Sequence, residues 1–129
     1  MQRILVIEDD AEERRMFVTV LRDAGYDVLD APEGETGIRM FHDAPCDVVL
    51  TDIFMPGKEG LETIFELKSE YPALKVIAVT GGTSWIHHSA DHSSDNLLNI
   101  AKTMGADRTL TKPINIQKLL STVEELLKK

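Results

Sequence analysis

The chain has 129 residues, of which 43% are hydrophobic and 28% are charged, a composition typical of one folded domain rather than of a disordered segment. Its 22 acidic residues outnumber its 14 lysines and arginines, and the net charge of −8 opposes direct binding to nucleic acid or to an anionic membrane surface. The first apolar run, residues 4–7, is too short for a signal peptide or a membrane span. The single cysteine, Cys46, has no partner for an internal disulfide and is interpreted as a buried or half-buried filler. We therefore predict one cytoplasmic domain over residues 1–129.

Short aliphatic runs alternate with helical periodicities from the start of the chain. Residues 4–7 form a continuous apolar run, which is typical of a parallel strand that is covered on both faces. The helix that follows has apolar residues at helical spacing: Phe17, Val20, Leu21 and Ala24. Gly25 supplies the left-handed residue that ends such a helix. Residues 26–31 predict a more polar strand at a sheet edge, and residues 35–43 predict a short helix.

The middle of the chain repeats this pattern. Residues 47–52 predict a third strand that ends in an acid, and Met55-Pro56-Gly57 predicts a turn. The third helix is expected to turn one face inward, formed by Leu61, Ile64, Phe65 and Lys68. Residues 75–79 predict a fourth buried strand.

The last third contains a departure from short connections. Residues 81–94 are polar and aperiodic, which predicts a long loop before a fourth helix at about residues 95–104. Residues 108–110 predict a short fifth strand, and Asn115 is the expected N-cap of the last helix. That helix has the clearest apolar stripe of the chain: Ile116, Leu119, Leu120, Val123, Leu126 and Leu127.

Five such strand-helix units predict an α/β fold, a doubly wound parallel sheet with five helices on its two faces, because parallel strands need right-handed crossovers. In these folds, ligands bind outside the carboxyl ends of the strands, where the strand order reverses. Functional side chains are therefore expected at that edge.

Polar residues follow four of the five predicted strands: Glu8-Asp9-Asp10, Asp52, Thr80 and Lys112-Pro113. Carboxylates that crowd one edge repel each other unless a divalent cation neutralises them, and an all-oxygen ligand set suits Mg²⁺. A carboxylate can then attack phosphorus to give an aspartyl phosphate. Lys112 and Thr80 can supply the cation and the hydrogen-bond donor that the phosphoryl oxygens need.

Four segments in this order resemble the receiver domains of bacterial response regulators. They are residues 4–10, residues 52–57, Thr80 before small residues, and Lys112-Pro113. The resemblance covers essentially the whole chain. It implies a flavodoxin-like receiver fold with strand order 2-1-3-4-5, and it implies a phosphoacceptor switch of a two-component or phosphorelay system.

The resemblance also implies a metal site. Asp52 would be the phosphoacceptor, and Glu8 and Asp9 would be the acidic pair, with Asp9 binding Mg²⁺ directly and Glu8 binding through water. The backbone carbonyl of Phe54 would complete the ligands that the protein supplies. The phosphoryl donor would be a sensor histidine kinase or a histidine phosphotransfer protein.

Around the phosphoryl group, the resemblance implies that Thr80 and Lys112 each bond one oxygen and that the Lys112–Pro113 peptide is cis. The signal would leave through an unknown protein partner, from a monomer or a weak homodimer. The domain would catalyse only its own phosphorylation and dephosphorylation and would not otherwise be an enzyme.

Two features depart from the usual receiver pattern. Thr109 stands where many receivers have the aromatic residue that moves with the threonine, and residues 81–94 are longer than the usual connection. We hypothesise that this loop replaces the aromatic residue as the moving element; unchanged hydrogen exchange across residues 81–104 with a phosphoryl mimic would refute this. Phe54 and Gly82 cannot orient an attacking water, which predicts slow dephosphorylation.

Several of these residues also have simpler interpretations. Residues 8–10, and Asp10 above all, could serve only as a helix cap. His88 and His92, with His87 nearby, could ligate a metal but are interpreted as solvated loop residues. Trp85 could anchor a partner or fold back onto the domain.

Two other functions compete with the phosphoacceptor switch. A phosphatase of the haloacid-dehalogenase type also uses an aspartate nucleophile with Mg²⁺, but it carries Asp-x-Asp after its first strand, where this chain has Glu8-Asp9-Asp10. A binding module that works without phosphorylation is the second alternative, and the missing aromatic residue at Thr109 keeps it open. A flavodoxin is disfavoured because its first loop uses Ser, Thr and Gly donors.

Overall fold

A computed structural model describes residues 2–53, 60–81, 102–103 and 105–128. The strands are β1 (Arg3–Ile7), β2 (Asp27–Ala31), β3 (Val48–Asp52), β4 (Lys75–Thr80) and β5 (Arg108–Thr111). The helices in the described ranges are α1 (Ala11–Asp23), α2 (Gly34–Asp43), α3 (Gly60–Glu70) and α6 (Ile116–Leu127). None of the helices described is long and apolar enough to span a membrane.

All strand pairs are parallel, and the sheet has the order β2-β1-β3-β4-β5. This confirms the predicted strand order and the edge position of β2. The chain runs outward from β1 to β2 in one direction and from β3 to β5 in the other, so the order reverses between β1 and β3. The carboxyl ends of these two neighbouring strands are therefore the expected place for a ligand.

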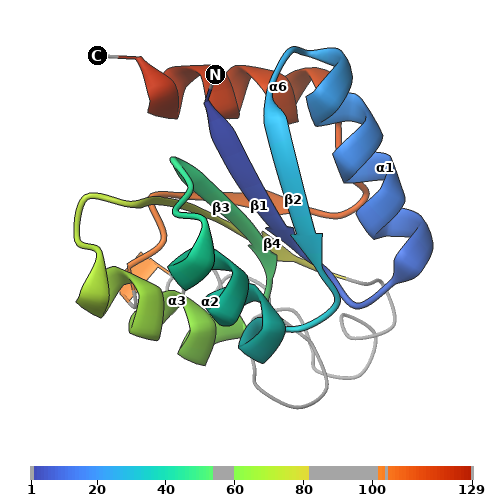
Figure 1. Cartoon of the computed structure of the whole chain (residues 1–129). Helices are drawn as coiled ribbons and strands as arrows, with labels where there is room; N and C mark the ends of the chain where they lie inside the picture. Colours follow the sequence, from blue (N-terminus) through green and yellow to red (C-terminus); the bar gives the residue numbers. More distant parts are fainter. Residues whose placement is uncertain (1, 54–59, 82–101, 104, 129) are drawn as a thin grey trace, which may run out of the picture.

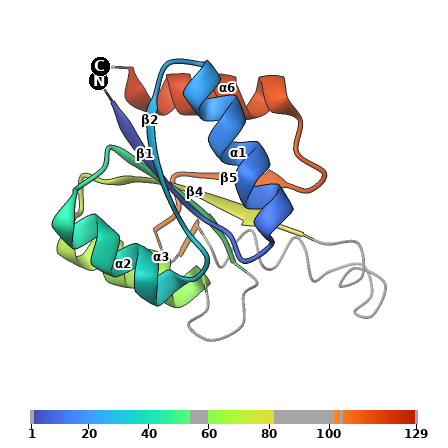
Figure 2. The same cartoon turned by 45° about the vertical axis from the view of Figure 1, so that its right-hand side comes forward.

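Helices cover both faces of the sheet, α1 and α6 on one and α2 and α3 on the other (Figures 1 and 2). The residues of β1 alternate between the two cores. Ile4 and Val6 belong to the cluster beneath α1 and α6, whereas Leu5 and Ile7 belong to the cluster beneath α2 and α3. A strand that is buried on both faces needs a continuous apolar run, which explains why residues 4–7 are uniformly aliphatic.

Two helix N-termini have the caps that the sequence predicts. The side chain of Asp10 accepts two backbone N–H groups in the first turn of α1, and the side chain of Asn115 accepts one in the first turn of α6. At the other end of α1, Gly25 has a φ of 102°, which places it in the left-handed region. Asp10 is thus a cap, as its simpler interpretation proposed.

The face that α3 turns inward differs from the prediction. The buried residues are Gly60, Thr63, Ile64 and Leu67. Phe65 is 56% exposed, so its predicted inward position is wrong, whereas Lys68 is half-buried and its ammonium lies 3.1 Å from the carboxylate of Asp107. Both sets have helical spacing. The close approach of Gly60 to the end of β3 decides between them, because a larger residue does not fit there.

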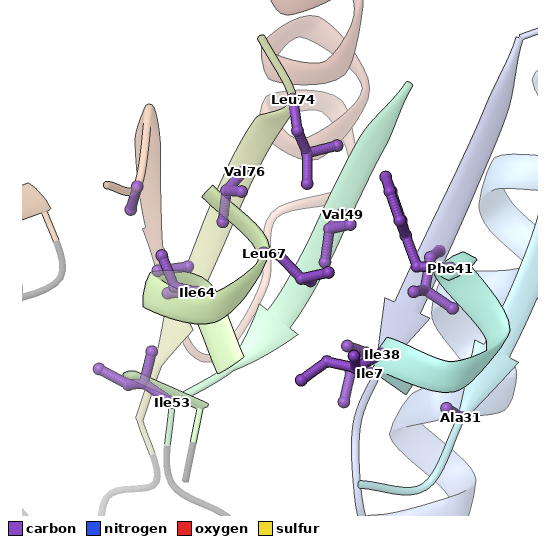
Figure 3. Packing of buried hydrophobic residues seen from close by; sticks show 13 residues of the cluster. Ile7, Ala31, Ile38, Phe41, Val49, Ile53, Ile64, Leu67, Leu74 and Val76 are labelled. Carbon is purple, nitrogen blue, oxygen red and sulfur yellow. The ribbon is translucent and has the colours of Figure 1, made fainter. Parts of the chain in front are cut away.

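Two truncations in α3 test this orientation. Leu67 is fully buried and lies on the side of α3 that faces the sheet (Figure 3). We expect Leu67→Ala to lower the free energy of unfolding by about 2–5 kcal/mol because it leaves a cavity. Phe65→Ala should change it by no more than about 0.5 kcal/mol. Urea denaturation of both variants measures the difference, and a larger loss in Phe65→Ala would favour the originally predicted face.

Smaller differences occur at the ends of two other helices. Ala24 follows the last turn of α1 and is exposed, and the buried residues of α1 include Val18, which was not predicted. Ile116 is 46% exposed, because side chains in a first turn tilt toward the N-terminus of the helix and away from its central contacts. The predicted loop over residues 81–94 lies outside the described residues except for Gly81, and the predicted helix over residues 95–104 does so except for residues 102–103.

Cys46 is half-buried and packs against the core beneath α2 and α3. Its thiol donates to the carbonyl of Ala44 over 3.3 Å. Burial raises the pKa of the Cys46 thiol to about 11. A thiol with this pKa is rarely ionised at neutral pH, which agrees with the interpretation of Cys46 as a packing residue.

Candidate functional site

The register of the sheet brings the polar residues at the strand ends together. Ile7 pairs with Thr51, so Glu8, the residue after β1, lies beside Asp52, the last residue of β3. In the same register Thr80 ends β4 opposite Thr111 of β5, and Lys112 follows. Four predicted site residues therefore lie at one edge of the sheet.

Lys112 is at the centre of these residues. Its Nζ lies 2.8 Å from Asp52 Oδ2 and 2.9 Å from Glu8 Oε1. A third carboxylate, Glu13 Oε2 of α1, lies 3.0 Å away. The side chains of Glu8 and Asp52 are only 2% and 6% exposed, so these ion pairs are shielded from water.

This environment changes the pKa values of two groups. Burial is the main cause that raises the pKa of Glu8 to about 8; the charge of Asp52 adds to the rise, and the hydrogen bond from Lys112 opposes it. Burial lowers the pKa of Lys112, but its hydrogen bonds to Asp52, Glu8 and Glu13 outweigh that effect and raise the pKa above its ordinary value. The lysine is thus firmly cationic, and the carboxylates around it repel each other.

Three acidic residues could hold a metal ion together. One carboxylate oxygen from each of Glu8, Asp9 and Asp52 lies within 4.8 Å of the others. Glu8 and Asp52 are buried and Asp9 is exposed, so the cluster opens to solvent on the side of Asp9. Oxygen ligands with one open side suit Mg²⁺, which keeps several waters when it binds to proteins. The geometry therefore fits the predicted ligand set as far as it is described.

Backbone contacts hold the acidic loop after β1 in place. The backbone N–H of Asp10 donates to Glu8 Oε2 over 3.2 Å. The guanidinium of Arg14 donates to the carbonyl of Glu8 over 2.8 Å and to Asp30 Oδ2 over 3.1 Å. Glu8 is thus held at its backbone and at its side chain, and it cannot move away from Lys112 without breaking these contacts.

Thr80 has a buried hydroxyl that finds no hydrogen-bond partner within the described part of the chain. Buried polar groups are nearly always paired, so such a group indicates a ligand, a water, an ion or a partner outside the described residues at this position. Its carbonyl accepts the backbone N–H of Lys112 over 2.9 Å, which ties the two residues together. The Lys112–Pro113 peptide is cis, as predicted.

Gly60 lets α3 approach the end of β3 closely. A Cβ atom at this position would collide with the carbonyl oxygen of Asp52 and the Cα of Ile53. These are backbone atoms, which cannot rotate away as a side chain can. The absence of a side chain at Gly60 therefore sets the position of Asp52.

We expect Gly60→Ala to displace the end of β3. The free energy of unfolding should fall by about 1–3 kcal/mol, as in other overpacked cores, and Mg²⁺ should bind more weakly because Asp52 moves relative to Asp9. Urea denaturation and a Mg²⁺ titration measure the two effects. Ser69→Ala, at an exposed position of α3, is the control, and equal behaviour of the two variants would show that the collision has no effect.

Some predicted features lie outside the described residues. These are Phe54, Gly82, Trp85, His87, His88 and His92. Thr109 is described and is half-buried in β5 beside Ala78. The hypotheses on the moving loop and on slow dephosphorylation remain predictions.

Among the described side-chain contacts of Lys112, the one with Glu13 was missed by the sequence analysis. Glu13 lies in the first turn of α1, which begins after the N-cap Asp10 and does not include Asp9. Its reach to Lys112 depends on where this helix starts, which the apolar pattern of the sequence does not define.

Comparison with known proteins agrees with this geometry. The family described as "Response regulator receiver domain" matches residues 4–124. Protein PilH of Pseudomonas aeruginosa is 33% identical over 129 residues, which cover 98% of both chains. A probable transcriptional regulatory protein of Picosynechococcus is 31% identical over 98% of this chain, which spans only 49% of that protein. The crystal structure of the response regulator TrrA of Thermotoga maritima, in complex with Mg²⁺ and BeF, is 28% identical with a TM-score of 0.80, and the match covers 98% of this chain and all of that one.

The chain therefore belongs to the response regulator receiver family. Its function is that of a phosphoacceptor in two-component signal transduction. Receiver domains bind Mg²⁺ in an acidic pocket, and in this chain Glu8, Asp9 and Asp52 form an acidic cluster at the edge of the sheet where such a pocket is expected.

Proposed function

We propose that Asp52 accepts a phosphoryl group from a sensor histidine kinase or a histidine phosphotransfer protein in a Mg²⁺-dependent reaction. The observation that carries this proposal is the position of Asp52: its carboxylate is buried, lies 2.8 Å from the Lys112 ammonium, and shares a metal-sized cluster with Glu8 and Asp9.

Mg²⁺ would be held by Asp9 and Asp52 directly, by Glu8 through water, and by the backbone carbonyl of Phe54, which lies outside the described residues. The donor set supports this assignment, because it consists of oxygen atoms alone and carries more negative charge than Lys112 can neutralise. When bound, the ion neutralises charge that develops on the phosphoryl oxygens.

In the reaction, a carboxylate oxygen of Asp52 forms a bond to phosphorus while the bond from phosphorus to the donor breaks, and the donor leaves with the electron pair. Lys112 would pair with one phosphoryl oxygen. The hydroxyl of Thr80 would donate to another, which would give this buried group the partner that it lacks among the described residues.

The partners of the domain follow from this chemistry. The phosphoryl donor and the downstream partner that takes up the signal would both be proteins. We propose that the domain works in the cytoplasm as a monomer or a weak homodimer. It would turn over no separate substrate. A multiple-turnover phosphatase assay separates this proposal from a haloacid-dehalogenase-type phosphatase, which would release many phosphates per chain.

Incubation with acetyl phosphate tests the proposal. The intact mass should rise by one phosphoryl unit in the presence of Mg²⁺ and should stay unchanged in EDTA. Failure to gain this mass with Mg²⁺ would favour the binding module that works without phosphorylation.

A further inference from the structure

The ammonium of Lys112 has no donor left for a new partner. A lysine ammonium has three N–H donors. The Nζ of Lys112 lies 2.8 Å from a carboxylate oxygen of Asp52, 2.9 Å from one of Glu8 and 3.0 Å from one of Glu13. A phosphoryl oxygen can therefore bond to Lys112 only after one of these carboxylates has moved away.

The three carboxylates differ in how easily they can leave. Asp52 would itself carry the phosphoryl group, so it stays in the site. Glu8 is buried, and its other oxygen accepts the N–H of Asp10. The side chain of Glu13 is 36% exposed, and it is attached to the surface helix α1, so it can turn into water at little cost.

We propose that Glu13 is a positioning residue that holds Lys112 in the unphosphorylated domain and releases it to the phosphoryl oxygen. This inference rests on the proposed function of Asp52. The negative charge of Glu13 opposes the negative charge of the arriving group, and both compete for the same cation. Glu13 thereby sets how strongly the site retains a phosphoryl group.

The variant Glu13→Gln keeps the shape of the side chain and removes its charge. We expect it to bind beryllofluoride, a mimic of the phosphoryl group, about two- to five-fold more tightly than the wild type at saturating Mg²⁺, which corresponds to the strength of a partly exposed ion pair. The phosphoryl group should also be lost more slowly from Asp52. Mg²⁺ alone should bind equally well or more weakly, because one negative charge has gone.

Tighter binding of beryllofluoride without tighter binding of Mg²⁺ separates positioning from a general loosening of the structure, which would weaken the binding of both ligands. Glu12→Gln is the matched control, since Glu12 lies beside Glu13 in the first turn of α1 and carries the same charge. None of the described ion pairs of Lys112 involves Glu12. The titrations can follow the heat of binding.

Equal beryllofluoride affinities of Glu13→Gln and Glu12→Gln would overturn the role of Glu13, and so would weaker binding by Glu13→Gln. In either case the wild type still binds beryllofluoride and the proposed function stands. A wild type that binds no beryllofluoride at saturating Mg²⁺ would overturn the proposed function and this inference with it.

Discussion

Asp52→Asn should abolish the gain of a phosphoryl group from acetyl phosphate. An amide has nearly the same shape as a carboxylate, but it is a much weaker nucleophile and carries no charge for Lys112 or for Mg²⁺. The substitution also removes one of the crowded acids, so the variant should fold at least as stably as the wild type in EDTA. Intact mass after incubation with Mg²⁺ and acetyl phosphate measures the first effect, and urea denaturation measures the second.

Asp47→Asn is the matched control for this substitution. Asp47 immediately precedes β3 and is exposed, so it lies at the opposite end of the same strand. This variant should gain the phosphoryl group as the wild type does. If Asp52→Asn gained as much as Asp47→Asn, the acceptor would be another residue.

Lys112→Met should slow phosphorylation by about 100- to 1,000-fold at saturating Mg²⁺, which is the usual loss when one group that stabilises developing charge is removed. Methionine fills a similar volume but offers no positive charge. Glu8 and Asp52 would then lose a buried partner, and we expect the free energy of unfolding in EDTA to fall by about 1–3 kcal/mol. The loss stays in this range because burial raises the pKa of Glu8, and without the opposing hydrogen bond from Lys112 this carboxyl can take up a proton.

The rate of phosphorylation by acetyl phosphate, followed by mass, measures the main effect of Lys112→Met. Lys75→Met removes the same charge at the exposed start of β4, and its rate should match that of the wild type. A rate for Lys112→Met within about three-fold of the wild type would mean that this lysine does not stabilise the phosphoryl group.

The fold could be predicted from the sequence because its signals are local and repeated. Each strand is a short aliphatic run, and each observed strand begins and ends within one residue of its predicted range. The orientation of α3 could not be predicted in this way, since two faces of the helix have the same spacing. The choice depends on how closely Gly60 approaches the backbone after β3, and this contact exists only in the folded chain.

In the candidate site too, some residues could be predicted from the sequence and others could not. Residues that follow strands directly, such as Asp52 and Lys112, could be placed at one edge because parallel strands share their direction. Glu13 comes from a helix, and its reach to Lys112 depends on the start of α1, which Asp10 fixes by capping it. The pKa of Glu8 could not be predicted either, because burial is its main cause and depends on the packing of the whole edge.

A crystal structure of the domain with Mg²⁺ and beryllofluoride tests the central claim most directly. We predict one Mg²⁺ ion between Asp9 and Asp52, with beryllofluoride on the carboxylate of Asp52 and its fluorine atoms near Thr80 and Lys112. An ion bound elsewhere, or beryllofluoride on another side chain, would contradict the account.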